Sequence, residues 1–508
     1  MMKQTLQRIG IIDIGSNSVR LVIYEVNTRG GHQILDQSKF SARLSQTIQP
    51  DGSIPAHAVD SLVDILHHFK LLCDAQQVTR IRAAATAAIR NASNQEAVIS
   101  SLIERTDLPI EVLSGEQEAE MGFIGMINSL PIQDGFMIDI GGGSTEICYF
   151  QQRKLVHSIS LPYGAVNSYT LLQSAPSLQA GKAAIRSAIQ EALKQAPWHT
   201  QNPGLPLVGL GGTIRNLCKI YQHRIQYSLD QTHAFEMSGT QMEEIMHLLM
   251  ESDVDSRKKL DGLSKDRADI IIPGVLILQT IYQSLQSSGY VICGSGLRDG
   301  LLYSAIWPSR AVLQSPIGYN VESFMNRYPL VPQRHVSQVM KHARSMMDAL
   351  QGGHTILAAD KQIVEAACLL YRIGVSVQFV QYYKHTYYLI ANSGLQGFTH
   401  RELVLCALVA SYKSKKKIKP YFNLHKDILH PEDFEWVVRY GTLLQLAASL
   451  DRSETQSIHT LDVQLADGQF QITAHLLRPA EIEQQAFLDT VSEFEKTWGL
   501  TAELQFRR

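Results

Sequence analysis

The chain has 508 residues, of which 45% are hydrophobic and 19% charged, and its formal net charge at pH 7 is −2. This length and composition predict a globular protein of about three to four domains. The near-neutral charge disfavours a protein coated to bind nucleic acid, so an anionic ligand would have to be held by local donors.

The cysteines and the N-terminus point to a cytoplasmic protein. The six cysteines lie far apart, form no Cys-x-x-Cys pair and stand mostly in apolar stretches, as reduced buried thiols do. The N-terminus carries no apolar signal core. The longest apolar run, 270–278, is interrupted by Pro273 and Gly274 and is too short to span a bilayer.

In chain order, the first feature is a buried strand at 9–14 that ends in the turn Asp13-Ile-Gly-Ser-Asn-Ser18, with a second strand at 19–26. The same layout returns at Asp139-Ile-Gly-Gly-Gly-Ser-Thr-Glu146. Glycines let backbone N–H groups approach an anion, and hydroxyls add donors. One such turn alone more often serves only its hairpin. The repeat predicts a duplicated domain whose two facing turns clamp a phosphate.

Between the two turns, helices and strands alternate. Residues 55–73 have the periodicity of an amphipathic helix, and 81–85 and 110–113 are typical of short strands. Ser114-Gly-Glu-Gln117 matches a capping box, so a helix should begin there. Its early turns carry Glu116, Glu118 and Glu120. Acidic residues at such positions commonly serve the helix dipole alone.

The strand, glycine and helix pattern appears twice more, at 207–215 and at 290–300. Helix N-termini after such turns are natural anion sites. Beyond a boundary at 308–316 the glycine turns disappear and helical periodicity takes over. The lysine-rich stretch 413–419 is predicted to be a compact loop that either grips a long polyanion or is merely solvated. From 458 onward, two strands, a helix and a last strand form a small α+β tail.

Seven ordered motifs between residues 8 and 305 resemble the exopolyphosphatase / guanosine pentaphosphate phosphohydrolase (Ppx/GppA) family, within the superfamily of actin-like ATPases and sugar kinases. The motifs lie at 13–20, 86–90, 114–119, 139–146, 209–215, 267–274 and 296–302. The resemblance implies an α/β protein of duplicated actin-like domains at 1–125 and 126–310. A helical HD-like domain at 317–455 and a small α+β domain at 456–508 would follow.

The HD-like part departs from an active HD domain. Where the His-Asp dyad should follow, the chain has Tyr371 and Arg372. We therefore expect a degenerate domain that grips substrate or dimerises, because a two-metal site would lack its central ligands. His335 and His385 are then expected to be ordinary packed or surface histidines.

The resemblance also implies roles for individual residues. Glu118 resembles the general base that activates water, and Asp139 and Glu146 resemble ligands of Mg²⁺. The phosphate-binding residues implied are Gly15, Ser16, Asn17, Ser18, Arg20, Arg90, Gly141, Gly142, Gly143, Ser144, Thr145, Gly211, Gly212, Thr213 and Arg267. Phosphoryl transfer depends mainly on positioning and charge stabilisation, which these residue types supply.

The favoured function is Mg²⁺-dependent, processive release of the terminal phosphate of inorganic polyphosphate. The close alternative is the 5′-phosphohydrolase of guanosine pentaphosphate (pppGpp), which needs the same chemistry. A third hypothesis, a non-catalytic nucleotide or alarmone sensor, is disfavoured because a sensor needs no base, and a kinase is disfavoured because the motif around Glu118 resembles the hydrolases. The resemblance further implies a homodimer, and we expect no nucleic-acid partner.

Overall fold

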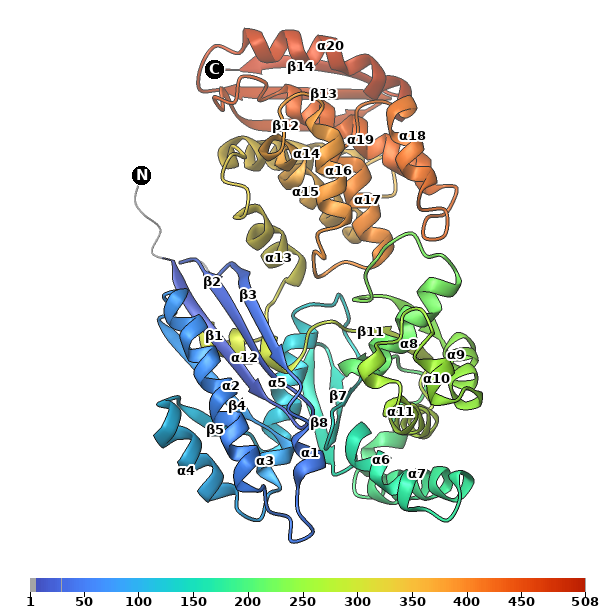
Figure 1. Cartoon of the computed structure of the whole chain (residues 1–508). Helices are drawn as coiled ribbons and strands as arrows, with labels where there is room; N and C mark the ends of the chain where they lie inside the picture. The colour runs from blue at the N-terminus through green and yellow to red at the C-terminus, as the bar shows by residue number, and fades with distance from the viewer. Residues whose placement is uncertain (1–5, 29, 508) are drawn as a thin grey trace. The chain divides into compact units, whose positions relative to one another are not determined.

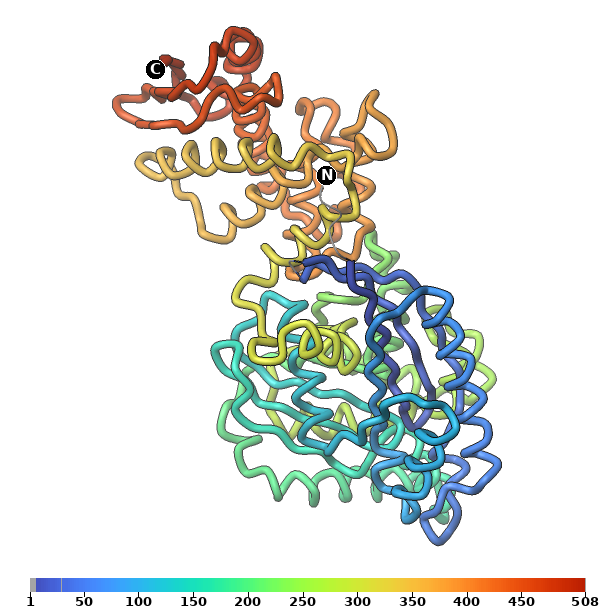
Figure 2. The backbone as a smooth tube through the Cα atoms, turned by 90° about the vertical axis from the view of Figure 1, so that its left-hand side faces the viewer, coloured from blue at the N-terminus to red at the C-terminus, as the bar shows by residue number. Residues whose placement is uncertain are grey.

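The computed structural model describes residues 6–28 and 30–507. The chain folds into two compact units, one formed by residues up to 227 together with 231–316, and the other by 228–230 and the chain from 317 onward. Figure 1 labels the elements of each unit, and Figure 2 traces the same backbone from the side. Among the helices of the described stretches, none is long and apolar enough to cross a membrane.

The first sheet of the N-terminal unit has the strand order β3-β2-β1-β4-β5. Its strands are β1 (Gln7–Ile14), β2 (Val19–Val26), β3 (His32–Phe40), β4 (Arg80–Ala85) and β5 (Ile110–Val112). β1, β2 and β3 pair antiparallel, whereas β4 and β5 extend the sheet in parallel. The helices α2 (Ala56–Ala75) and α4 (Gln95–Thr106) cover one face of this sheet (Figure 1), where Leu62, Phe69 and Leu102 pack against Ile12 and Ile14.

The second sheet has the order β10-β11-β9-β6-β7-β8. It repeats the arrangement of the first sheet and adds β10 at its edge, antiparallel to β11. Its strands are β6 (Gly135–Ile140), β7 (Thr145–Gln151), β8 (Lys154–Leu161), β9 (Leu207–Leu210), β10 (Glu236–Ser238) and β11 (Gly289–Ile292). β6, β7 and β8 pair antiparallel, and β9 and β11 extend the sheet in parallel. The matching topology confirms the duplicated domain that the repeated turns predicted.

Helices fill the space around the second sheet. The longer ones are α6 (Ala165–Ser174), α7 (Leu178–Leu193), α8 (Gly211–Arg224), α9 (Gly239–Glu251) and α11 (Ile271–Leu285). The short elements of the unit are α1 (Leu44–Thr47), α3 (Ala87–Arg90), α10 (Val254–Arg257), η1 (Pro197–Thr200) and η2 (Lys265–Arg267). The apolar side chains of the longer helices form one core with the inner face of the second sheet, which includes Ile138, Ile189, Leu217, Ile245 and Ile277.

Two helices, α5 (Gly115–Ile127) and α12 (Leu297–Ile306), pack against each other where the two halves of the unit meet. The approach is close because a Cβ at Gly300 would lie 1.9 Å from the carbonyl oxygen of Met121. Although α12 follows the second sheet in the chain, its Leu301 and Leu302 pack against the outer face of the first sheet. The border predicted between residues 125 and 126 falls inside α5.

The C-terminal unit begins with helices and ends with a small sheet. Its helical elements are α13 (Pro316–Met325), α14 (Gln333–Leu350), α15 (Ala358–Leu370), η3 (Ile373–Ser376), α16 (Tyr382–Ala391), α17 (His400–Ala410), α18 (Lys415–Asn423), α19 (Asp433–Ser449) and α20 (Glu481–Trp498). The strands β12 (Ile458–Ala466), β13 (Gln469–Leu476) and β14 (Thr501–Arg507) form the sheet. In the tail the elements follow the order strand, strand, helix and strand.

The prediction of a basic loop at 413–419 was wrong, because α18 begins at Lys415 and runs to Asn423. Ile418 and Phe422, four residues apart, are both buried on one face of this helix, while the lysines are exposed. This pair anchors the helix, since residues i and i+4 share a face. The six cysteines are free and buried, as predicted.

Candidate active site

The turn after β1 and the turn after β6 face each other in the N-terminal unit. A Cβ placed on Gly143 would lie 2.8 Å from Ser16 Oγ, and one on Gly142 would lie 3.0 Å from Ser16 Cβ. Both turns are closed by the same backbone hydrogen bond, from Gly15 N–H to Ser18 O at 3.2 Å and from Gly141 N–H to Ser144 O at 3.0 Å. The two turns expected to clamp a phosphate are therefore adjacent.

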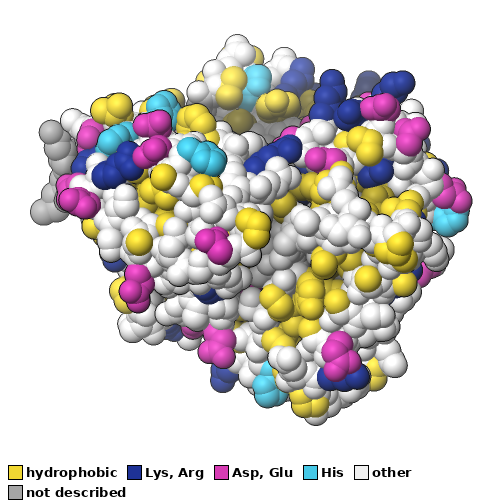
Figure 3. All heavy atoms as spheres, turned by 60° about the horizontal axis from the view of Figure 1, so that its bottom comes forward, with side chains coloured by type: hydrophobic (Ala, Val, Ile, Leu, Met, Phe, Trp, Pro, Cys, Tyr) yellow, Lys and Arg dark blue, Asp and Glu magenta, His cyan; other side chains and the backbone are white. Residues whose placement is uncertain are grey.

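The two turns open into a cleft with an empty volume of about 1000 Å³. Figure 3 shows the side of the N-terminal unit on which the surface is hollowed between its two halves. Of the residues assigned roles from the sequence, the cleft is lined by Gly15, Ser16, Asn17, Ser18, Arg20, Glu118, Asp139, Gly141, Gly142, Gly143, Ser144, Glu146, Gly211, Gly212 and Arg267. Among the described residues that line it, none carries an aromatic ring.

Three residues predicted to bind phosphate lie outside this cleft. Thr145 is fully buried and its hydroxyl donates to the carbonyl oxygen of Tyr163 at 2.6 Å. It points away from the cleft because side chains alternate along a strand, and its neighbour Glu146 points in. Thr213 is also fully buried, against Gly274. Arg90 lies next to Glu118 and lines a separate hollow.

Glu118 stands in the first turn of α5, whose N-terminus is closed by the predicted capping box of Ser114 and Gln117. Arg90 Nη1 donates to Glu118 Oε2 at 2.7 Å and to the carbonyl oxygen of Leu113 at 2.9 Å. Burial raises the pKa of Glu118 to about 7, although the neighbouring guanidinium lowers it. A carboxyl group with a pKa near neutrality is suited to accept a proton from water.

Asp139 and Glu146 are directly opposite each other on the antiparallel strands β6 and β7, so their side chains project from the same face. Glu146 is almost fully buried, and Ser160 Oγ donates to its Oε1 at 2.9 Å. Burial raises the pKa of both carboxyl groups, and the negative charge of Glu118 raises that of Glu146 further.

These two carboxylates fit Mg²⁺. Within the described residues, no group of three or more His, Cys, Asp or Glu side chains forms a metal cage. Mg²⁺ does not need one, because it commonly binds through one or two carboxylates and completes its shell with water and substrate phosphates. The raised pKa values of Asp139 and Glu146 reflect buried negative charge that a divalent cation would compensate.

Four arginines also line the cleft, namely Arg20, Arg215, Arg267 and Arg298. Burial lowers the pKa of Arg20 to about 10, and the positive charge of Arg298 adds to this effect. Burial likewise lowers the pKa of Arg215 and of Arg267. Guanidinium groups crowded together in a buried site are strong donors to phosphate oxygens.

Glycines at the start of α8 bring this helix close to the carboxylates. Gly211 has a φ of +87°, and a Cβ there would lie 2.8 Å from the carbonyl oxygen of Ile140 and 2.9 Å from Asp139 Oδ1. At Gly212 a Cβ would lie 2.0 Å from Arg267 Cζ. The missing side chains therefore leave the space that the helix terminus and the Arg267 guanidinium occupy.

Asp13, Arg215, Arg298 and Asp299 line the cleft, although the sequence reasoning assigned them no role. Asp13 precedes the first turn, and the other three lie in helices that follow glycine turns at 209–212 and 294–296. Burial raises the pKa of Asp13 and of Asp299, against the opposing charge of Arg298. A survey of charged residues within one and a half helical turns of each glycine turn would have found them.

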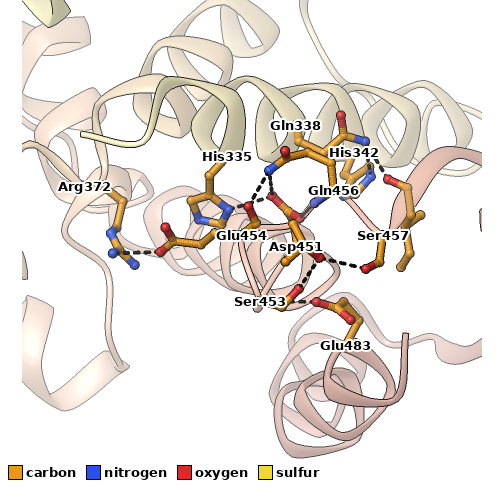
Figure 4. Close-up of polar contacts among 12 residues, drawn as sticks. His335, Gln338, His342, Arg372, Asp451, Ser453, Glu454, Gln456, Ser457 and Glu483 are labelled. Atoms are coloured by element: carbon orange, nitrogen blue, oxygen red, sulfur yellow. Dashed lines mark hydrogen bonds and ion pairs between the residues drawn. The ribbon is translucent and has the colours of Figure 1, made fainter. Parts of the chain in front are cut away.

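In the C-terminal unit, His335 and Asp451 belong to a buried hydrogen-bond network (Figure 4). His335 Nδ1 pairs with Asp451 Oδ2 at 2.8 Å, and its Nε2 contacts the hydroxyl of Tyr371. Asp451 also accepts from the backbone N–H of Gln456 at 2.8 Å. His335 is buried with both ring nitrogens engaged, as expected for a packed histidine, whereas His385 is half-buried on α16.

Comparisons with known proteins match this chain to one family. Residues 22–307 match the model of the Ppx/GppA phosphatase family, and residues 319–490 match that of Ppx/GppA phosphatase domain III. An exopolyphosphatase from Cytophaga hutchinsonii is 23% identical over 60% of this chain and 100% of its own, with a TM-score of 0.55. A Ppx/GppA family member from Aquifex aeolicus is 26% identical over 60% and 99%, with a TM-score of 0.52.

The duplicated sheets and the cleft between facing glycine turns define an enzyme of the actin-like fold that acts on phosphoryl groups. The family match covers more than half of the chain, and the chain therefore belongs to the Ppx/GppA phosphatase family. It is a phosphoanhydride hydrolase.

Proposed function

We propose that this protein is an exopolyphosphatase that removes the terminal phosphate of inorganic polyphosphate with water activated by Glu118. The proposal rests on one observation above the others, the position of the Glu118 carboxyl group. It lies in a cleft lined by donor-rich turns and arginines, and burial raises its pKa to about 7. A base of this pKa can take the proton of an attacking water near neutral pH.

In the proposed reaction, the turns at Ser16 and Gly143 and the arginines of the cleft hold the terminal phosphate. Glu118 accepts a proton from water as the water oxygen bonds to phosphorus and the bridging P–O bond breaks. The electron pair of that bond leaves with the shortened chain, whose terminal phosphate needs no proton. Asp139 and Glu146 would hold Mg²⁺, which supplies positive charge to the phosphate oxygens when bound.

The choice of polyphosphate over pppGpp rests on the lining of the cleft. Proteins commonly bind nucleobases by stacking them on aromatic side chains. Among the described residues of the cleft none is aromatic, while four arginines and four glycine turns supply donors to phosphate groups. A chain of phosphates can use such donors along its whole length.

The test is phosphate release by the purified protein with Mg²⁺, from long-chain polyphosphate and from pppGpp in parallel. We expect faster release from polyphosphate, in a processive manner that leaves few chains of intermediate length, and loss of both activities in Glu118→Gln. Faster release from pppGpp would instead indicate that the nucleotide is the substrate. The predicted homodimer and the gripping role of the C-terminal unit stay predictions.

A further inference from the structure

A second hollow lies beside the cleft, next to Glu118. Its empty volume is about 910 Å³, and it is bordered by the C-terminus of α3, the N-terminus of α5 and the strand β8. The side chains of Arg90, Asn91, Glu116, Ser158 and Ser160 line it. None of these five lines the cleft, so the hollow is a separate space.

The wall between the two spaces is made of side chains around the proposed reaction centre. Glu118 lines the cleft and Arg90 lines the hollow, and the two are joined by a hydrogen bond of 2.7 Å. Glu146 likewise lines the cleft and is joined at 2.9 Å to Ser160, which lines the hollow.

Ser144 lines both spaces. The two spaces are thus separated by paired side chains, and rotation of the Arg90 and Glu118 side chains would join them. The two side chains are 17% and 14% exposed, so neither is locked in a fully packed core.

The lining of the hollow suits a small oxyanion that must not be retained. Arg90 supplies one guanidinium, Ser158 and Ser160 supply hydroxyls, and Asn91 supplies an amide. Glu116 opposes them with one carboxylate. Donors without a net positive charge allow an oxyanion to pass but hold it weakly, unlike the arginine-rich cleft.

A processive enzyme needs such a route. While a shortened chain remains in the cleft, it obstructs the path by which the released orthophosphate could return to solvent. We propose that the second hollow is the exit site for orthophosphate and that Arg90 is its gate. In this route Arg90 exchanges its bond to Glu118 for one to the product, and the phosphate leaves past Ser158 and Ser160. The inference rests on the proposed hydrolysis of a terminal phosphate.

The test blocks the hollow with a bulky side chain. Ser158 and Ser160 lie on the same face of β8, two residues apart, but Ser158 has no bond to Glu146. Ser158→Trp should fill the exit and leave the cleft intact. Val156→Trp, at a position that is 45% exposed on the same strand and lines neither space, is the matched control. Asn91→Trp obstructs the hollow from the opposite wall.

Two measurements are compared for each protein, cleaved phosphate in acid-quenched samples and free phosphate detected by a fluorescent phosphate-binding protein. For the wild type and Val156→Trp the two time courses should coincide. For Ser158→Trp we expect a burst of cleaved phosphate before any is free. Its steady-state rate should then be lower by on the order of tenfold, which corresponds to a barrier higher by about 1.4 kcal/mol.

Coincident time courses in folded Ser158→Trp and Asn91→Trp would overturn the exit site. An equal loss of single-turnover cleavage and of steady-state release would also overturn it, because the hollow would then serve the chemistry itself. If the wild type released no phosphate from either substrate, the proposed function itself would be wrong. That result differs from the two outcomes that would overturn the exit site alone.

Discussion

Arg90 and Glu118 form an ion pair, with Nη1 of the arginine 2.7 Å from Oε2 of the glutamate. The same nitrogen also donates to the carbonyl oxygen of Leu113, which precedes α5. Arg90 therefore ties the carboxylate to the start of its own helix. In this arrangement the arginine positions the proposed base and favours its charged form, and it does so from outside the cleft that holds the substrate.

Removal of this guanidinium should move the pH dependence of hydrolysis. Arg90 lowers the pKa of Glu118 from the value that burial alone would produce, and with the arginine present that pKa is about 7. In Arg90→Gln the pKa of Glu118 should rise, so the base stays protonated to higher pH. We expect the acid limb of kcat/KM against pH to shift to higher pH. Arg82→Gln, which removes an ion pair to Glu111 on the same sheet, should leave the limb in place.

Glu118→Gln should reduce kcat by about 10²–10⁴, the usual contribution of a general base. Binding of polyphosphate, measured by filter retention or calorimetry, should change little, because the arginines and glycine turns remain. Glu120→Gln is the control, since this residue lies on the same helix and does not line the cleft. An equal loss of binding and turnover in Glu118→Gln would assign Glu118 a structural role.

The buried carboxylates should make the stability of the protein depend on pH and on Mg²⁺. Burial raises the pKa of Asp13, Asp139 and Glu146 above their ordinary values. The folded state then binds protons more tightly than the unfolded state, so the free energy of unfolding falls as pH rises above the ordinary carboxyl range, about 4. We expect Mg²⁺ to raise Tm more at pH 8 than at pH 5.

Asp139→Asn tests whether Asp139 is a carboxylate through which Mg²⁺ raises Tm. This variant should raise the Tm of the metal-free protein at pH 8, because it removes one buried charge, and should lose most of the Mg²⁺ effect. Asp255→Asn, at a highly exposed position, should behave like the wild type. If Mg²⁺ stabilised Asp139→Asn as much as the wild type, Asp139 would not be a ligand.

Gly211→Ala should destabilise the protein and impair hydrolysis together. Gly211 has a φ of +87° and its Cβ would meet the Ile140 carbonyl oxygen at 2.8 Å, whereas Gly204 has a φ of +82° and open space around it. Gly204→Ala should therefore lower the free energy of unfolding only by the strain of an alanine in the left-handed conformation, about 1–2 kcal/mol. Its kcat should not change. Urea unfolding and initial rates measured on both variants separate backbone strain from damage to the cleft.

Asp451→Ala should affect stability alone. Asp451 is fully buried and bonded to His335 and Gln456, and removal of one partner of a buried pair typically destabilises by about 3–5 kcal/mol. Rates per folded molecule and their dependence on Mg²⁺ should equal those of the wild type. An altered metal titration of the rate would instead indicate a second metal centre in the C-terminal unit.

The sequence predicted the two facing turns, the duplicated domain and the helix start before Glu118, because each depends on local patterns of a few residues. It did not predict that Thr145 and Thr213 turn away from the cleft. Each motif as a whole resembles a phosphate-binding segment. Which of its side chains point into the cleft depends on the alternation of side chains along β7 and on the orientation of α8 about its axis. The hydrogen bond between Arg90 and Glu118 joins residues 28 positions apart, so no pattern in the local sequence predicts it.

The return of α12 to the first sheet has a consequence for synthesis on the ribosome. Ile9, Ile11, Val22 and Tyr24 face Leu301 and Leu302, so the outer face of the first sheet is completed only after the second half of the unit has been made. Roughly 190 residues separate the end of the first sheet at Val112 from Leu301. Their translation takes on the order of 10–40 s at about 5–20 residues per second. Throughout that time this apolar sheet face lacks the part of its cover that α12 provides, so we expect the nascent chain to bind chaperones that shield hydrophobic surface.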